Sequence, residues 1–121
     1  AFAVGLLSVA VLNMNNMRDQ ESDKKSNKIT IPVLLGYEMS KHYHFALITF
    51  AGITALAYAI LQWDVTGIYG LIPLLAFIPL AKNAFVVRKN TEPILLDSEL
   101  KKIALSTFFY SILVFVSFLL A

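Results

Sequence analysis

The chain has 121 residues, of which 58% are hydrophobic and only 15% are charged, and its mean hydropathy is +0.70. Soluble domains carry about 25% charged residues, so this composition excludes a disordered segment and a nucleic-acid-binding arm. The chain has no cysteine, which excludes a disulfide framework, a thiolate metal site and a cysteine nucleophile.

The first twelve residues (AFAVGLLSVAVL) carry no charge. A helix needs about 20 apolar residues to cross a bilayer, so residues 1–12 are too short to span it alone. They start at alanine with no basic residues before them, which argues against a signal peptide. We therefore expect residues 1–12 to be the end of a helix that begins upstream, in a larger protein of which this chain is the C-terminal part.

Three further uncharged runs follow, at residues 45–63, 65–81 and 103–121. Their length and lack of alternation argue against β-barrel strands and against buried helices of a soluble protein. Transmembrane helices are expected at residues 45–63, 65–87 and 103–121, with a kink where Pro73 and Pro79 interrupt the second. The predicted fold is an all-α, polytopic transmembrane helical bundle with about four spans, the first incomplete.

All ten basic residues fall in two polar segments, residues 13–44 and 82–102. Alternating spans would place both segments on the same side of the membrane. The positive-inside rule then predicts that residues 13–44 form a cytoplasmic loop and that the C-terminus is non-cytoplasmic.

The first polar segment contains the candidate chemistry. Asn15, Asp19 and Asp23 are spaced i, i+4, i+8 and would share one helix face if the first helix continues. Two carboxylates one turn apart suit Mg²⁺, a hard cation that takes one or two carboxylates plus phosphate oxygens. Arg18 and Lys28 are placed to meet an anion. The alternative is a solvated segment whose acids pair with nearby bases, and spacing alone leaves both interpretations open.

Three other features have structural interpretations. Thr30 is a possible cap for a short helix ending at Gly36, and Asp97 is a possible cap for the last helix. His42 and His44 would point to different sides of a helix, which favours interfacial packing over a shared metal.

The run NNMRDQESD (residues 15–23), followed by NKITIPVLLG (residues 27–36), resembles the second aspartate-rich motif of the UbiA-type intramembrane prenyltransferases. It looks most like the 1,4-dihydroxy-2-naphthoate prenyltransferase (MenA) branch. Two positions depart from the family pattern. Asn27 stands where glycine is usual, and asparagine is the next-best residue for a left-handed turn. Leu34 stands where a basic residue is common.

The resemblance implies an enzyme that transfers a prenyl group from a polyprenyl diphosphate to an aromatic acceptor, and the MenA branch implies dihydroxynaphthoate, in menaquinone synthesis. Asp19 and Asp23 would be catalytic and would hold Mg²⁺, while Asn15, Arg18 and Lys28 would bind the diphosphate. The family has about nine helices and a first motif that is absent here. The chain would therefore need the N-terminal half of the same enzyme, and alone it is expected to be inactive.

The implied location is the lipid bilayer of a bacterial inner membrane. Two alternatives remain: another branch of the family, with a hydroxybenzoate, chlorophyllide or haem acceptor, or a non-enzymatic membrane module for binding or transport.

Overall fold

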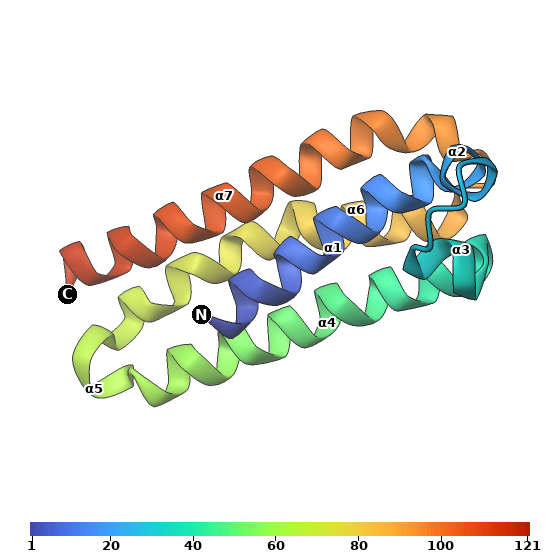
Figure 1. Cartoon of the computed structure of the whole chain (residues 1–121). Coiled ribbons are helices and arrows are strands. Elements are labelled where there is room, and N and C mark those ends of the chain that lie inside the picture. The colour runs from blue at the N-terminus through green and yellow to red at the C-terminus, as the bar shows by residue number, and fades with distance from the viewer.

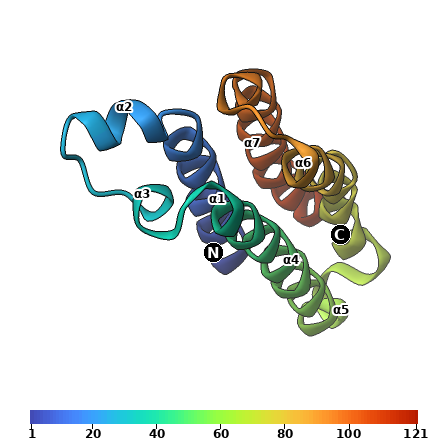
Figure 2. The ribbon, with the colours of Figure 1, turned by 90° about the vertical axis from the view of Figure 1, so that its right-hand side faces the viewer.

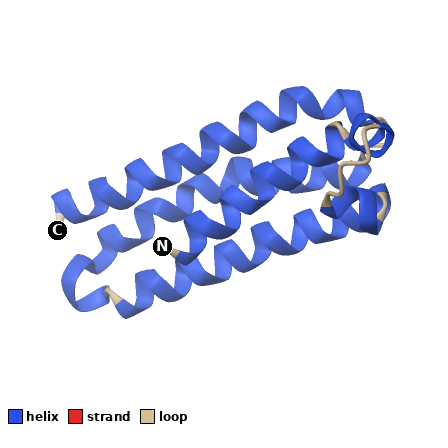
Figure 3. Ribbon diagram, viewed as in Figure 1, coloured by secondary structure: helices blue, strands red, loops and turns tan.

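A computed structural model describes residues 1–121, and it is built almost entirely of helices, with no strand (Figure 3). Four long helices run along the bundle: α1 (Phe2–Arg18), α4 (Tyr37–Leu61), α6 (Phe77–Lys89) and α7 (Leu96–Leu120). Shorter elements connect them: α2 (Gln20–Lys25), α3 (Ile31–Leu35), α5 (Trp63–Thr66), and the 3₁₀ segments η1 (Gly67–Ala76) and η2 (Pro93–Leu95). The all-α fold expected from the sequence is confirmed.

The long helices form a ring in the order α1, α4, α6, α7, in which each packs against the next and α7 closes on α1. Figure 1 places α2 and α3 at one end of this bundle and α5 at the other. The view along the bundle shows α2 and α3 projecting outward beyond α1 (Figure 2). Both polar segments therefore meet at one end, as the alternation of spans predicted.

Three helical stretches are long and apolar enough to cross a membrane: Tyr37–Leu61, Trp63–Lys89 and Pro93–Leu120. Their outer faces carry large exposed apolar side chains, including Phe50, Phe85 and Phe115. Such a surface suits hydrocarbon, where a helix satisfies its own backbone polar groups. The expectation of a helical membrane bundle is met.

The helix boundaries differ from the predicted ones in the polar segments. Residues 13–44 are not one loop, because α1 continues to Arg18 and α4 already begins at Tyr37. Likewise α7 begins at Leu96, before the uncharged run at residues 103–121. Charge marks where a helix leaves the apolar layer, whereas the backbone hydrogen bonds continue beyond that boundary.

The predicted helix at residues 65–87 is divided. Gly67–Ala76 form a 3₁₀ segment that contains Pro73, and the α-helix begins at Phe77. Proline lacks an N–H donor and clashes with the preceding turn, which disfavours a regular α-helix at Pro73. Pro79 lies in the first turn of α6, where a missing donor is tolerated. The two prolines thus have different effects.

Small side chains allow the helices to approach closely. Ala51, Ala55 and Ala59 recur every fourth residue on α4 and are buried. Close packing between small residues drives helix association in membranes, because lipid is as apolar as the helix surface. Between α6 and α7, Phe77 and Tyr110 pack edge to face with ring centroids 5.6 Å apart.

A buried polar cluster joins three of the long helices. The Nε2 atom of His44 lies 3.1 Å from Oδ1 of Asn83, and Nδ2 of Asn83 donates to Oε2 of Glu99 at 2.9 Å. These side chains come from α4, α6 and α7. We call His44, Asn83 and Glu99 the polar layer. It fixes the start of α7 relative to its neighbours because each hydrogen bond requires one particular alignment.

Candidate active site

The aspartate-rich motif, residues 15–23, lies across the junction between α1 and α2. Asp19 is both the C-cap residue of α1 and the N-cap residue of α2. The backbone N–H of Asp19 donates to Asn15 at 3.1 Å, and that of Asp23 donates to Asp19 at 2.9 Å. These bonds span four residues each, so helical spacing persists through the break. The motif thus keeps the one-turn separation that the sequence predicted.

Arg18 is the centre of the hydrogen bonding in the motif. Its Nε donates to Oδ1 of Asp19 at 2.8 Å, and its Nη2 donates to Oδ2 of the same carboxylate at 2.9 Å. Nη2 also donates to Oδ1 of Asn15 at 3.0 Å. Asn15 therefore orients the guanidinium in this structure, through a contact within the α1 helix.

The close pairing shifts the ionisation of both partners. The hydrogen bond from Arg18 holds the pKa of Asp19 below its usual range, although partial burial opposes the shift. The same bond raises the pKa of Arg18, with Asp97 adding to the effect. Both groups are therefore charged at neutral pH.

Asp23 is paired separately from Asp19. Lys28 Nζ donates to its two carboxylate oxygens at 3.1 and 3.2 Å. The side chain of Asp23 is 9% exposed and that of Lys28 is 56% exposed. The alternative interpretation expected a solvated segment whose acids pair with nearby bases. The ion pairs are present, but the carboxylate of Asp23 is buried rather than solvated.

The chain between α2 and α3 turns back through a left-handed residue. Asn27 has φ 56° and is the one non-glycine residue with positive φ. This confirms that asparagine supplies the turn at a position where the family usually has glycine. Gln20 Nε2 then donates to the carbonyl of Pro32 at 2.6 Å, which holds α3 beside α2.

The short helix predicted after Thr30 is present as α3, and it ends at Gly36 with φ 80°. Thr30 occupies the predicted capping position in an extended conformation, but its hydroxyl makes no capping hydrogen bond and is buried without a partner.

Asp97 is a member of the site that sequence reasoning missed. Arg18 Nη1 donates to Oδ1 of Asp97 at 2.9 Å, across 79 positions of sequence. The predicted capping role of Asp97 is wrong, because α7 has Leu95 as its cap residue and no side-chain capping bond. The available signal was topological: both polar segments lie on one side, so an acid of the second can reach a base of the first.

His44 and His42 separate as predicted, since His44 is buried in the polar layer and His42 is exposed. No group of three or more histidine, cysteine, aspartate or glutamate side chains is arranged to hold a metal. Any cation at the motif would thus depend on the two aspartates together with oxygen atoms of a ligand.

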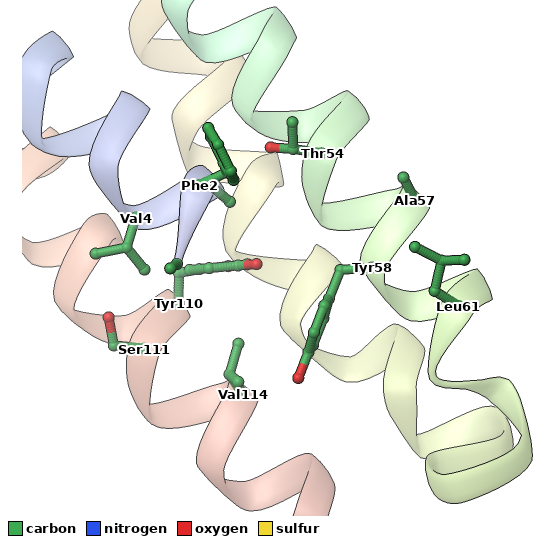
Figure 4. Close-up of a pocket in the computed structure, with 11 residues that line it drawn as sticks. Phe2, Val4, Thr54, Ala57, Tyr58, Leu61, Tyr110, Ser111 and Val114 are labelled. Atoms are coloured by element: carbon green, nitrogen blue, oxygen red, sulfur yellow. The ribbon is translucent and has the colours of Figure 1, made fainter.

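A cavity of about 440 Å³ lies between the first turn of α1 and the C-terminal halves of α4 and α7. The hydroxyl groups of this mostly apolar lining belong to Thr54, Tyr58, Tyr110 and Ser111 (Figure 4). The helix segments that line this cavity lie away from the end of the bundle that carries α2 and α3 (Figure 1). It is therefore separate from the charged site.

Comparison with known proteins matches residues 1–113 to the UbiA prenyltransferase family. The chain is 36% identical over 98% of its length to a protein of Haemophilus influenzae named 1,4-dihydroxy-2-naphthoate octaprenyltransferase, covering 36% of that protein. A protein of Escherichia coli with the same name is 35% identical over 84% of the chain, covering 32% of that relative. No solved structure gives a significant match.

The chain thus spans about a third of the length of these curated relatives. The family match covers nearly all of the chain and includes the motif, the polar layer and most of α7. Together with the helical bundle and its clustered aspartates, it establishes that the chain belongs to the UbiA prenyltransferase family.

Proposed function

We propose that the complete protein transfers a prenyl group from a polyprenyl diphosphate to 1,4-dihydroxy-2-naphthoate, in menaquinone synthesis, and that this chain supplies its C-terminal part. The observation that carries the proposal is the grouping of Asp19, Asp23, Arg18 and Lys28 at one end of the bundle. The names of the two relatives support the acceptor.

The reaction needs a site that stabilises a leaving diphosphate. When the allylic C–O bond breaks, its electron pair leaves with the diphosphate and an allylic cation remains. The aromatic ring attacks this cation, and the ring carboxylate then leaves as CO₂, whose bonding electron pair restores the aromatic ring. Cationic donors aimed at the developing negative charge lower the barrier. Arg18 supplies a planar guanidinium and Lys28 an ammonium group that is more than half exposed. Both are thereby suited to bind the phosphate oxygens.

The donor atoms of the motif also fit Mg²⁺. Asp19 and Asp23 offer hard carboxylate oxygens, and Mg²⁺ is usually held by one or two carboxylates plus substrate phosphates. Asp19 accepts two hydrogen bonds from Arg18, which leaves further lone pairs on its two oxygens. When bound, Mg²⁺ would supply positive charge to the leaving group. The residues that would hold it are Asp19 and Asp23.

The decisive experiment uses the complete reading frame, reconstituted in lipid. Purified protein is incubated with a polyprenyl diphosphate, Mg²⁺ and each of several aromatic acceptors, and prenylated product is measured. Asp19→Ala and Asp23→Ala are expected to abolish transfer, whereas Glu21→Ala, an exposed acid between them, is the matched control. Preference for hydroxybenzoate, chlorophyllide or haem would assign another branch of the family. Cation binding without transfer to any acceptor would favour the non-enzymatic alternative.

The isolated 121-residue chain is expected to show no transfer, because it covers about a third of its relatives. Prenyl transfer by this chain alone would contradict that expectation. The motif is proposed to face the cytoplasm from the inner membrane, in line with the distribution of basic residues.

A further inference from the structure

Asp97 connects the first turn of α7 to the aspartate-rich motif. Its Oδ1 accepts from Arg18 Nη1 at 2.9 Å, and the two residues are otherwise separated by most of the chain. The second basic neighbour, Lys101, is farther away, with Nζ 3.9 Å from Oδ2 of Asp97. Arg18 is therefore the main partner of Asp97.

The contact completes a nearly full set of hydrogen bonds around the guanidinium. Arginine has five N–H donors in a fixed plane. Two of them bind Asp19, one binds Asn15 and one binds Asp97. One Nη1 hydrogen has no acceptor, and it belongs to the nitrogen that Asp97 holds. With the plane fixed from two sides, the direction of this last donor is also fixed.

We propose that Asp97 is a positioning residue that orients the guanidinium of Arg18, so that its remaining Nη1 hydrogen is available to the diphosphate of the substrate. The inference deepens the proposed function and rests on the role of Arg18 in binding that diphosphate. Asn15 and Asp19 hold Arg18 only from its own helix and the adjoining junction. Asp97 adds the one long-range contact, which an isolated motif would lack.

The start of α7 is well anchored for this role. Glu99 is two residues beyond Asp97, and both its backbone carbonyl and its carboxylate accept from Asn83, at 3.1 and 2.9 Å. Glu99 is 5% exposed, so this anchor is buried. Asp97 itself is half exposed at 54%, which leaves room for a ligand beside it. The buried contacts of Glu99 fix the backbone near Asp97, and this suits Asp97 to position the side chain of Arg18.

The test compares Asp97→Asn, Asp97→Glu and the control Glu92→Gln in the complete protein. Glu92 is an exposed acid of the same polar segment and has no ion-pair partner. Two quantities are measured: the affinity for inorganic pyrophosphate with Mg²⁺ present, and the KM values for prenyl diphosphate and acceptor. Melting temperature is recorded for each variant.

Asp97→Asn is expected to weaken pyrophosphate binding and raise the KM for prenyl diphosphate about tenfold, as loss of an outer partner commonly does. The acceptor KM and melting temperature should stay unchanged, Asp97→Glu should recover part of the loss, and Glu92→Gln should resemble wild type. Wild-type pyrophosphate affinity in Asp97→Asn would overturn the inference. So would an equal rise in both KM values with a lower melting temperature and no recovery in Asp97→Glu. A wild-type protein that binds pyrophosphate but transfers no prenyl group would instead overturn the proposed function.

Discussion

Lys28 donates from one ammonium group to both carboxylate oxygens of Asp23, at 3.1 and 3.2 Å, across the left-handed turn at Asn27. The carboxylate is buried while the lysine is more than half exposed. The pair therefore has two roles to separate: it neutralises a buried charge, and it places a cation beside a proposed metal ligand.

Removing the lysine tests the first role. Lys28→Ala is expected to destabilise the folded protein by about 1–3 kcal/mol, because it leaves a buried carboxylate without its charged partner. The measurement is the melting temperature in a mild detergent. Lys25→Ala is the control, since Lys25 is exposed and makes no ion pair. Equal stability in both variants would contradict the prediction.

The double variant Asp23→Asn/Lys28→Met separates the two roles. It removes both charges together, so we expect stability to recover relative to Lys28→Ala. Prenyl transfer should be absent, as expected for Asp23→Ala, because the double variant also lacks the proposed metal ligand Asp23. Recovery of activity along with stability would show that Asp23 has only a structural role.

The left-handed backbone at Asn27 predicts an asymmetric response to substitution. Asn27→Gly should be tolerated, because glycine adopts positive φ without strain. Asn27→Val should cost about 1–2 kcal/mol, since a β-branched residue is disfavoured there. Activity and melting temperature of the two variants provide the test. A valine variant as stable as the glycine variant would mean that the turn rearranges without cost.

The pairing of Arg18 with Asp19 predicts a pH effect. Because Arg18 lowers the pKa of Asp19, this pair contributes stability above the ordinary pKa of an aspartate, and the contribution is lost as pH falls through the lowered pKa. In Arg18→Gln the folded-state pKa of Asp19 returns toward its unfolded value, so the protein should be less stable at neutral pH and should lose less stability as the pH falls.

The measurement is the melting temperature between pH 3 and 7, a window about the ordinary aspartate pKa of about 3.9. Arg88→Gln is the control, because Arg88 packs over the ring of Phe45 and makes no ion pair with Asp19. An unchanged profile in Arg18→Gln would mean that the hydrogen bonds seen here do not set the ionisation of Asp19.

The proposed orientation can be tested by labelling, since the chain has no cysteine of its own. Ser26→Cys, exposed after α2, and Ala121→Cys, exposed at the end of α7, are placed singly in a cysteine-free form of the complete protein. A membrane-impermeant thiol reagent added to intact spheroplasts should label position 121 but not position 26. The opposite pattern would reverse the topology.

Much of the bundle could be predicted from sequence because membrane helices obey a simple rule of length and charge. The runs at 45–63 and 103–121 fall almost entirely within two long helices, α4 and α7. The ends of these helices were less predictable, because backbone hydrogen bonding continues into residues such as Tyr37 and Leu96 that lie beside charges. The 3₁₀ geometry around Pro73 depends on packing that a local pattern does not report.

The motif was predictable in composition but only partly in its contacts. The bond of Arg18 to Asn15 spans three residues, a spacing at which side chains meet on a helix, whereas the bond to the adjacent Asp19 forms where α1 ends. The contact of Arg18 with Asp97 depends on how α1 and α7 align, and no local rule contains that distance. Asn83 gave a signal that was available, since an amide inside an otherwise apolar helix needs a partner.

The polar layer has a consequence for how the bundle assembles. Apolar helices can slide along one another with little change in contact. A shift of α6 by one turn, about 5.4 Å, would however break the bonds of Asn83 to both His44 and Glu99. The layer therefore allows only one position of α7 along the bundle axis relative to α6. Since Asp97 is two residues from Glu99, this axial position of α7 also determines whether Asp97 can reach Arg18.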